Sequence, residues 1–184
     1  MKNRGLLSTK NVIMAGMFAA VLAVLSQLSI PMPTGVPVTL QTFAVALTAY
    51  VLGWKLGTLA TFVYILAGAV GVPVFANFSG GIHVIVGMTG GFIWGFIFMV
   101  LLCGLGLAQK NKVMTVVLSG AGLVICHLLG IFQFMAVAGM GFREAALAVS
   151  VPYLLKDIIS VAVAYVLALA VRKALAAADI SVYV

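Results

Sequence analysis

The sequence has very little charge, and almost none of it is negative. Of 184 residues, 7% are charged, and only three are acidic against ten that are basic. Soluble domains carry about 25% charged residues, whereas this chain is 65% hydrophobic. It has no surface suited to water, so the composition predicts an all-α integral membrane protein covered by lipid.

The motifs of several large enzyme classes are absent as well. The chain has no GxxxxGK[ST] phosphate loop, no HExxH metal motif and no GxSxG nucleophile motif. We therefore expect no enzyme, no metal and no cofactor, and no use of ATP through such a loop. The net charge of +7 comes without interleaved aromatic and basic residues, so nucleic acid is not an expected partner. Cys103 and Cys126 form no CxxC motif and are expected to be small packing side chains.

Apolar segments long enough to cross a membrane fill most of the chain. A spanning helix needs about 20 apolar residues, and the stretches IPMPTGVPVT and GVPVFANFSGG are too rich in proline and glycine for regular helix. No linker or repeat divides the chain, so residues 1–184 are predicted to form a single membrane domain. The first apolar segment has no convincing cleavage site, and we expect it to be retained. Six transmembrane helices in one bundle are expected, at about residues 11–29, 40–52, 56–70, 82–108, 113–138 and 149–171.

Basic residues collect in alternate loops of this arrangement. Cytoplasmic segments of membrane proteins are enriched in Lys and Arg, and Arg143, beside Glu144, is the basic residue of the opposite segments. We therefore predict a multi-pass protein of the cell membrane, in contact with lipid, with both termini cytoplasmic. The residues assigned to the cytoplasmic side are Lys2, Arg4, Lys10, Lys55, Lys110, Lys112, Arg172 and Lys173.

Two adjacent opposite charges interrupt the last apolar segment, in VPYLLKDIIS. Asp157 would lie roughly 10 Å below the outer end of its helix, and an ionised group at membrane depth costs about 3 kcal/mol or more. Lys156 is long enough to extend to the interface, but Asp157 is not. One interpretation is a structural ion pair, or an anchoring lysine with an incidental aspartate. The other is a substrate site open to the outside.

Three further polar residues are expected on the same outer side. Asn77 lies in the apolar loop VPVFANFSGG, where a buried amide needs a partner, although asparagine is also common in turns. Thr39 and Gln41 open a helix in GVPVTLQTF. Thr39 has an ordinary alternative as a helix cap, whereas Gln41 is expected to line a pocket.

Aromatic residues and one threonine complete the candidate site. Phe75 and Phe78 flank Asn77 and are placed either over a small apolar ligand or against the bundle. Thr89 and Phe92 lie near the outer end of their helix and are candidate ligand contacts. In the next helix, His127 is interpreted as a satisfied bundle residue rather than a metal ligand or proton relay.

Small residues recur at helical spacing in two segments. Gly87, Gly91 and Gly95 predict a ridge that lets a neighbouring helix approach closely. In the first segment Ala15, Ala19 and Ala23 form a stripe, with Gly16 and Ala20 beside it. The stripe is typical of internal packing or of docking against another membrane protein, and the residues alone do not choose between them.

Five motifs occur along the chain in the order GVPVTLQTF, LGWKLG, YILAGAVGVPVFANFSGG, GMTGGFIWGF and PYLLKD. In this order they resemble the BioY family, the biotin-specific substrate-binding (S) components of energy-coupling factor (ECF) vitamin transporters. The similarity covers about residues 10–173. It implies a six-helix S component with a biotin site near the outer face, which works with a transmembrane coupling subunit and two ATPases. It also implies that the stripe Ala15, Ala19 and Ala23 docks the coupling subunit.

The resemblance also suggests how the site residues act. Asp157 would accept from the ureido N–H groups of biotin, Asn77 or Gln41 would complete that end, and aromatic rings would cover the thiophane ring. The chain departs from the family in three places: Met88 replaces a proline, Phe92 a tyrosine and Ser160 a lysine. Lys156 lies about one helical turn before Ser160 and would meet either the ureido carbonyl or the carboxylate.

Two other functions stay open. A stand-alone secondary transporter would carry protons on Asp157 or His127. An S component for another vitamin would share the fold and differ in its ligand. No role is predicted for residues 179–184.

Overall fold

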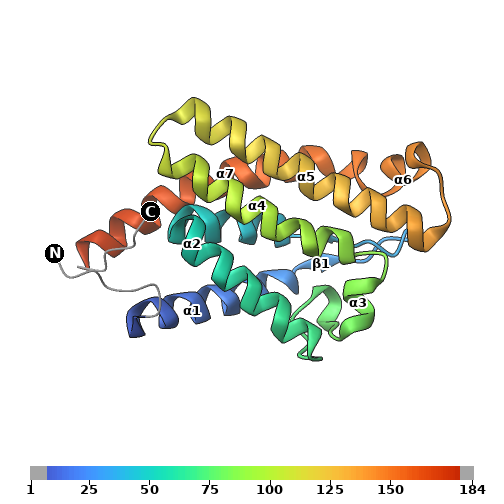
Figure 1. Cartoon of the computed structure of the whole chain (residues 1–184), viewed down its shortest axis with the longest axis horizontal. Coiled ribbons are helices and arrows are strands. Elements are labelled where there is room, and N and C mark those ends of the chain that lie inside the picture. The colour runs from blue at the N-terminus through green and yellow to red at the C-terminus, as the bar shows by residue number, and fades with distance from the viewer. Residues whose placement is uncertain (1–7, 179–184) are drawn as a thin grey trace.

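Five long helices make up most of the molecule. A computed structural model describes residues 8–178, so Lys2, Arg4 and the segment 179–184 lie outside the described residues. The long helices run alongside one another, and most of the short elements gather at one end of the bundle (Figure 1). In chain order the elements are α1 (Thr9–Ser26), β1 (Ser29–Ile30), β2 (Val38–Thr39), α2 (Gln41–Ala69), a 3₁₀ turn (Ala76–Phe78), α3 (Ile82–Val86), α4 (Gly90–Ala108), α5 (Lys112–Ala138), α6 (Phe142–Val149) and α7 (Val151–Ala177).

The α2 element turns back on itself at Gly53. This glycine has φ 76° and ψ 177°, a conformation that residues with a side chain rarely adopt. On either side of this turn, the side chain of Gln41 donates to the Tyr64 hydroxyl at 2.9 Å, although the two residues are 23 positions apart. A straight helix would separate these residues by about 35 Å. The two arms of α2, residues 41–52 and 54–69, are therefore antiparallel, and they correspond to the expected helices 40–52 and 56–70.

The predicted helices differ from the observed ones in number and in several bounds. Within residues 8–178, five helices are long and apolar enough to cross a membrane, one fewer than predicted, because α2 takes the place of two. The single helix expected over 82–108 is wrong, since residues 87–89 separate α3 from α4. The last helix was expected from 149, but α6 ends there. Ser150 leaves helical geometry at φ −126° and ψ −61°, and Pro152 opens α7.

The proline-rich stretch after α1 forms a small β-ribbon that the sequence did not predict. Ser29 pairs with Thr39 and Ile30 with Val38, antiparallel. The Tyr153 hydroxyl of α7 donates to the Val36 carbonyl at 2.7 Å. This bond ties the ribbon to the start of α7.

Glycines bring α4 and α5 together as the ridge prediction expected. A Cβ at Gly95 would lie 2.6 Å from the Cys126 Cα, and one at Gly91 would lie 2.1 Å from the Leu129 carbonyl oxygen. Only residues without a side chain allow this approach, so the prediction is confirmed for Gly91 and Gly95. Gly87 lies outside α4, and its missing side chain makes room for the His83 carbonyl instead.

The alanine stripe of α1 faces the interior of the bundle. Ala15 and Ala19 are 3% and 9% exposed and belong to the main core, and Ala23 is partly buried against it. Internal packing, one of the two interpretations, therefore describes Ala15 and Ala19. While α1 keeps this position, these two methyl groups are not available to a partner. Gly16 and Ala20 lie on the exposed side of α1.

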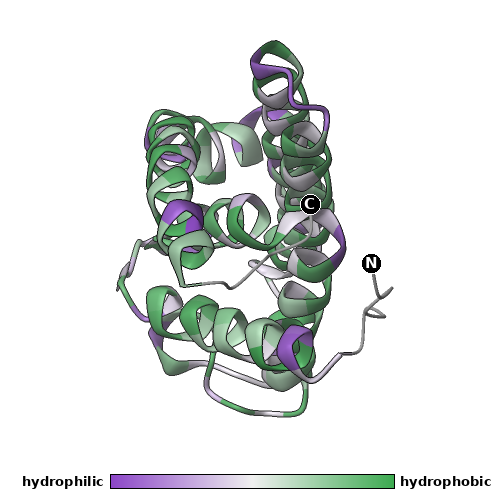
Figure 2. Cartoon of the chain, turned by 90° about the vertical axis from the view of Figure 1, so that its left-hand side faces the viewer, coloured by the Kyte–Doolittle hydropathy of each residue, from purple (hydrophilic) through white to green (hydrophobic). Residues whose placement is uncertain are grey.

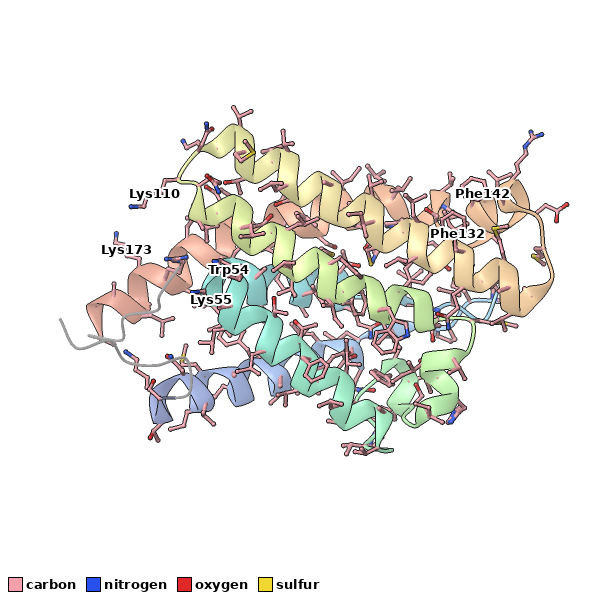
Figure 3. The ribbon with its side chains drawn as sticks, in the orientation of Figure 1. Trp54, Lys55, Lys110, Phe132, Phe142 and Lys173 are labelled. Carbon is pink, nitrogen blue, oxygen red and sulfur yellow. The ribbon has the colours of Figure 1, made fainter. Side chains whose placement is uncertain are left out.

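The outer surface is apolar along the helices, and several lysines lie at one end. Hydrophobic residues make up most of the helices (Figure 2), and large apolar side chains such as Leu155 and Val166 are 71% and 67% exposed. Such a surface is stable in lipid. Lys55, Lys110 and Lys173 lie at the end where α1 begins and α7 ends, whereas Phe132 and Phe142 lie toward the other end (Figure 3).

Candidate functional site

A cavity of about 290 Å³ lies at the end of the bundle away from those lysines. Its walls come from the ribbon loop, the starts of α2, α4 and α7, the loop before α3, and α3 itself. Eight residues predicted to bind substrate line this cavity. These residues are Thr39, Gln41, Phe75, Asn77, Thr89, Phe92, Lys156 and Asp157.

Asp157 is the acidic residue of the described cavity wall, and it is held between two nitrogens. Its side chain is 7% exposed, with Oδ2 3.2 Å from the Nε2 of His127. Oδ1 contacts the ammonium group of Lys156. The ion pair of the first interpretation therefore exists, and the cavity of the second lies directly beside it.

Lys156 bends toward the ribbon instead of extending to the membrane surface. Its ammonium group donates to the Thr39 carbonyl at 2.8 Å, and its side chain is 29% exposed. The charge is thus shared between a backbone oxygen and the Asp157 carboxylate. One cation and one anion are held at the same part of the cavity wall.

A chain of hydrogen bonds fixes the Gln41 amide at the start of α2. Its oxygen accepts from the Thr39 hydroxyl at 3.0 Å, and its nitrogen donates to the Tyr64 hydroxyl at 2.9 Å. Tyr64 in turn meets the Ser26 hydroxyl at 2.8 Å, and Ser26 donates to the Leu22 carbonyl at 2.6 Å. Because Ser26 donates to Leu22, Tyr64 is the donor to Ser26. The chain links α1 to both arms of α2 and orients the polar wall.

Asn77 projects from a left-handed turn in the loop before α3. Its φ of 57° and ψ of 37° lie in a region where asparagine is tolerated better than most residues. The side-chain oxygen accepts from the Ser29 hydroxyl at 2.7 Å. Among the described residues no acceptor meets the amide nitrogen, which leaves two N–H donors at the cavity.

Thr89 and two of the aromatic residues form the rest of the predicted wall. Thr89 precedes α4 and makes no capping hydrogen bond with its side chain. Phe75 is 1% exposed and packs edge-on against Tyr64, with ring centroids 5.5 Å apart. Phe92 packs in the same way against His127 at 5.8 Å. Phe78 was placed either over a ligand or against the bundle, but it is 72% exposed and outside the cavity lining, which fits neither placement.

His127 is buried, with partners on both ring nitrogens. Nδ1 lies 2.8 Å from the Ser150 hydroxyl, and Nε2 faces Asp157. The prediction of a satisfied bundle residue is confirmed, but its contact with the site aspartate was missed. The two residues are 30 positions apart, and no spacing rule pairs them.

Other cavity residues were missed although some carried a signal. Tyr153 lies one helical turn before Asp157 and therefore on the same face of α7, so the PYLLKD motif already contained it. Thr42 follows Gln41 in the quoted motif GVPVTLQTF. His83 and Phe96 also line the cavity but stand in segments that offered no polar periodicity to single them out.

The arrangement suits binding rather than bond breaking. It offers one carboxylate, one ammonium group, two side-chain amides and aromatic rings around a small cavity. Asp157 has no second carboxylate in the described wall with which to share acid–base work. A ligand with N–H donors, a carbonyl acceptor and an apolar ring would match these groups.

Comparisons with known proteins agree on one family. The BioY family profile matches residues 1–177. The biotin transporter BioY of Thermotoga maritima is 44% identical over 165 residues, covering 89% of this chain and 96% of the relative. The probable biotin transporter BioY of Pyrococcus horikoshii is 38% identical over 162 residues, covering 88% of this chain and 96% of the relative.

The fold is also found in a solved structure. The crystal structure of the S-component for biotin from an ECF-type ABC transporter superposes with a TM-score of 0.82. It covers 94% of this chain and 95% of its own, at 20% sequence identity. At that identity the likeness concerns the fold alone.

Proposed function

This chain belongs to the BioY family, and on that premise we propose that it is the membrane subunit that captures biotin for an ECF-type importer. The observation that carries the proposal is the buried Asp157 carboxylate, paired with Lys156 and facing a cavity of about 290 Å³. A charge at this depth is costly unless it serves a partner or a ligand. Relatives named as biotin transporters match the chain along most of its length.

The chemistry of biotin fits the groups of the cavity. Its ureido ring carries two N–H donors and one carbonyl, its thiophane ring is apolar and its tail ends in a carboxylate. Asp157 accepts from a ureido N–H, and such charge-assisted bonds are strong in a dry site. Phe75 and Phe92 supply apolar wall for the ring.

Lys156 meets the ureido carbonyl in this proposal. Its ammonium group contacts Asp157 and the Thr39 carbonyl, so both charges address the same end of a ligand. An ammonium group beside the ureido carbonyl and a carboxylate beside the ureido N–H would complement that ring. The carboxylate tail of biotin then extends away from α7.

The two arms of α2 support a six-pass topology with the cavity outside. Counting each arm as a pass, α1 begins and α7 ends on the same side of the membrane. The described basic residues on that side are enriched in the way cytoplasmic segments are, and we propose that both ends of the chain are cytoplasmic. Those residues are Lys10, Lys55, Lys110, Lys112, Arg172 and Lys173.

Energy for transport would come from partner subunits, a transmembrane coupling subunit and two ATPases. The similar S-component belongs to an ECF-type ABC transporter, and this chain has no phosphate loop. On α1, the exposed small residues Gly16 and Ala20 offer the closest approach to a coupling subunit, with the partly buried Ala23 one turn farther. Gly16→Leu and Ala20→Leu should then reduce co-purification of the coupling module while biotin binding stays unchanged.

Equilibrium binding of labelled vitamins to the purified protein in lipid nanodiscs tests the function. Biotin should bind, and unlabelled thiamine and riboflavin should not displace it. Displacement by either would identify an S component for another vitamin, and no biotin binding at all would refute the proposal.

The contact between His127 and Asp157 favours a second candidate, proton-coupled transport without partner subunits. Both groups can exchange protons, and they touch beside the cavity. Uptake of labelled biotin by cells that lack the coupling subunit and ATPases, abolished by an uncoupler, would support that candidate. The primary proposal predicts no such uncoupler-sensitive uptake.

A further inference from the structure

His127 touches the candidate site without lining the cavity. Its Nε2 lies 3.2 Å from Asp157, and its ring packs edge-on against Phe92. Both neighbours line the cavity, whereas His127 is 5% exposed and stands behind them. A residue in this position acts on a ligand only through the groups it holds.

The two oxygens of Asp157 are not equivalent. Oδ2 faces His127, and Oδ1 contacts the Lys156 ammonium group. Oδ1 is buried against the Lys156 ammonium group, and Thr42 also lies within reach of this carboxylate. A carboxylate oxygen has two lone pairs, so Oδ1 can accept an N–H group of a ligand while it contacts Lys156.

The hydrogen bonds around His127 are consistent with one tautomer. Its Nδ1 lies 2.8 Å from the Ser150 hydroxyl, which can donate to that nitrogen. The proton then stays on Nε2 and points at Asp157.

The interruption of helical geometry between α6 and α7 places Ser150 beside His127. Ser150 departs from helical geometry, and its carbonyl accepts from the backbone N–H groups of Tyr153 and Leu154. Its hydroxyl meets His127 of α5 just before α7 begins. The first turn of α7 leads to Lys156 and Asp157.

We propose that His127 is a positioning residue for biotin: its Nε2–H holds Oδ2 of Asp157, so that Oδ1 and Lys156 face the ligand, and Ser150 selects the tautomer. This inference rests on the proposed function of biotin capture. Such outer partners are often needed to orient the groups that bind a ligand.

Variants of His127 measured for biotin affinity in nanodiscs test the inference. His127→Leu keeps the bulk and removes the donor, and it should weaken biotin binding about tenfold, since hydrogen bonds to charged groups carry that much or more. His127→Gln retains an N–H near the Nε2 position and should recover most of the affinity. His127→Asn reaches only toward Ser150 and should resemble His127→Leu.

A double-mutant cycle separates positioning from general damage. In an Asp157→Asn background, His127→Leu should cause little further loss, because the two residues act through one contact. Thr115→Val is the matched control, since Thr115 lies on the same helix and bonds the Gly106 carbonyl at 3.1 Å, far from the cavity. It should lower thermal stability and leave biotin affinity unchanged.

Three results would overturn the inference while biotin capture stands. These are wild-type affinity in His127→Leu, no rescue by His127→Gln, or an undiminished loss in the Asp157→Asn background. If the wild-type protein binds no biotin, the proposed function fails first, and this inference fails with it.

Discussion

Two cations of α7 make the same kind of contact at opposite ends of the bundle. Lys156 donates to the Thr39 carbonyl at 2.8 Å, just before α2. Arg172 donates to the Tyr50 carbonyl at 3.2 Å, just before the break in α2. Only Lys156, of these two, contacts a carboxylate and a cavity among the described residues.

The difference separates a structural cation from a functional one. Tyr50 lies in the last turn before Gly53, where helix carbonyls lose their partners, and a cation there stabilises the helix end. The Thr39 carbonyl lies at the edge of the ribbon, and Lys156 is held there together with a buried acid. One end of α7 is closed by packing, and the other stays open for a ligand.

Removing the charge of Asp157 should have the largest effect on biotin affinity. The two ends of α7 would then no longer differ in the presence of a carboxylate. Asp157→Asn keeps the shape of the side chain and removes its charge. We expect biotin affinity to fall about hundredfold, because the charge-assisted bond and the ion pair are both lost. Labelled-biotin binding measures this, and an unchanged affinity would remove Asp157 from the site.

Changing the break in α2 should affect the closed end instead. Gly53→Ala forces a side chain into φ 76°, which costs about 1–3 kcal/mol. Thermal unfolding of the purified protein should show the loss, whereas the folded fraction keeps its biotin affinity. Gly16→Ala is the control, since a Cβ at Gly16 meets nothing within 4 Å. Equal effects of the two variants would contradict the assigned backbone.

Removing the Asn77 amide at the cavity end should lower biotin affinity by a smaller factor. Asn77→Gly keeps the left-handed turn accessible and removes the amide, so biotin affinity should fall about tenfold. Ser29→Ala removes the same hydrogen bond from the other side and leaves the amide in place. A loss as large in Ser29→Ala would mean that loop order, and not the amide, matters.

Arg172 should give the smallest effect. Arg172→Met retains the apolar part of the side chain and removes the contact with Tyr50, at a cost of about 0.3–1 kcal/mol in stability. Biotin affinity should equal that of the wild type. Weakened binding would show that the two ends of α7 are coupled and that Arg172 is more than a structural cation.

The polar site could be predicted because its residues stand out against apolar surroundings. Asp157 and Lys156 interrupt a membrane segment, and Asn77 interrupts an apolar loop. Burial of such groups is costly, which makes each a candidate without knowledge of the fold. The cavity lining contains all of them.

The missed features depend on tertiary packing that periodicity does not encode. His127 and Asp157 meet because α6 and the break at Ser150 bring α5 and α7 together. The alanine stripe of α1 adjoins Gly16 and Ala20, so small residues occur on two faces, and the pattern alone does not say which one faces α2. The break between α3 and α4 falls at residues 87–89, where Gly87 was interpreted as part of a helix-packing ridge and not as a helix end.

A structure of the protein with biotin bound tests the central claim most directly. The account predicts density for the ureido ring against α7, with an N–H within about 3.2 Å of Asp157 Oδ1, and Lys156 beside the ureido carbonyl. Biotin bound elsewhere, or bound in the cavity with its ureido ring turned away from Asp157, would contradict it.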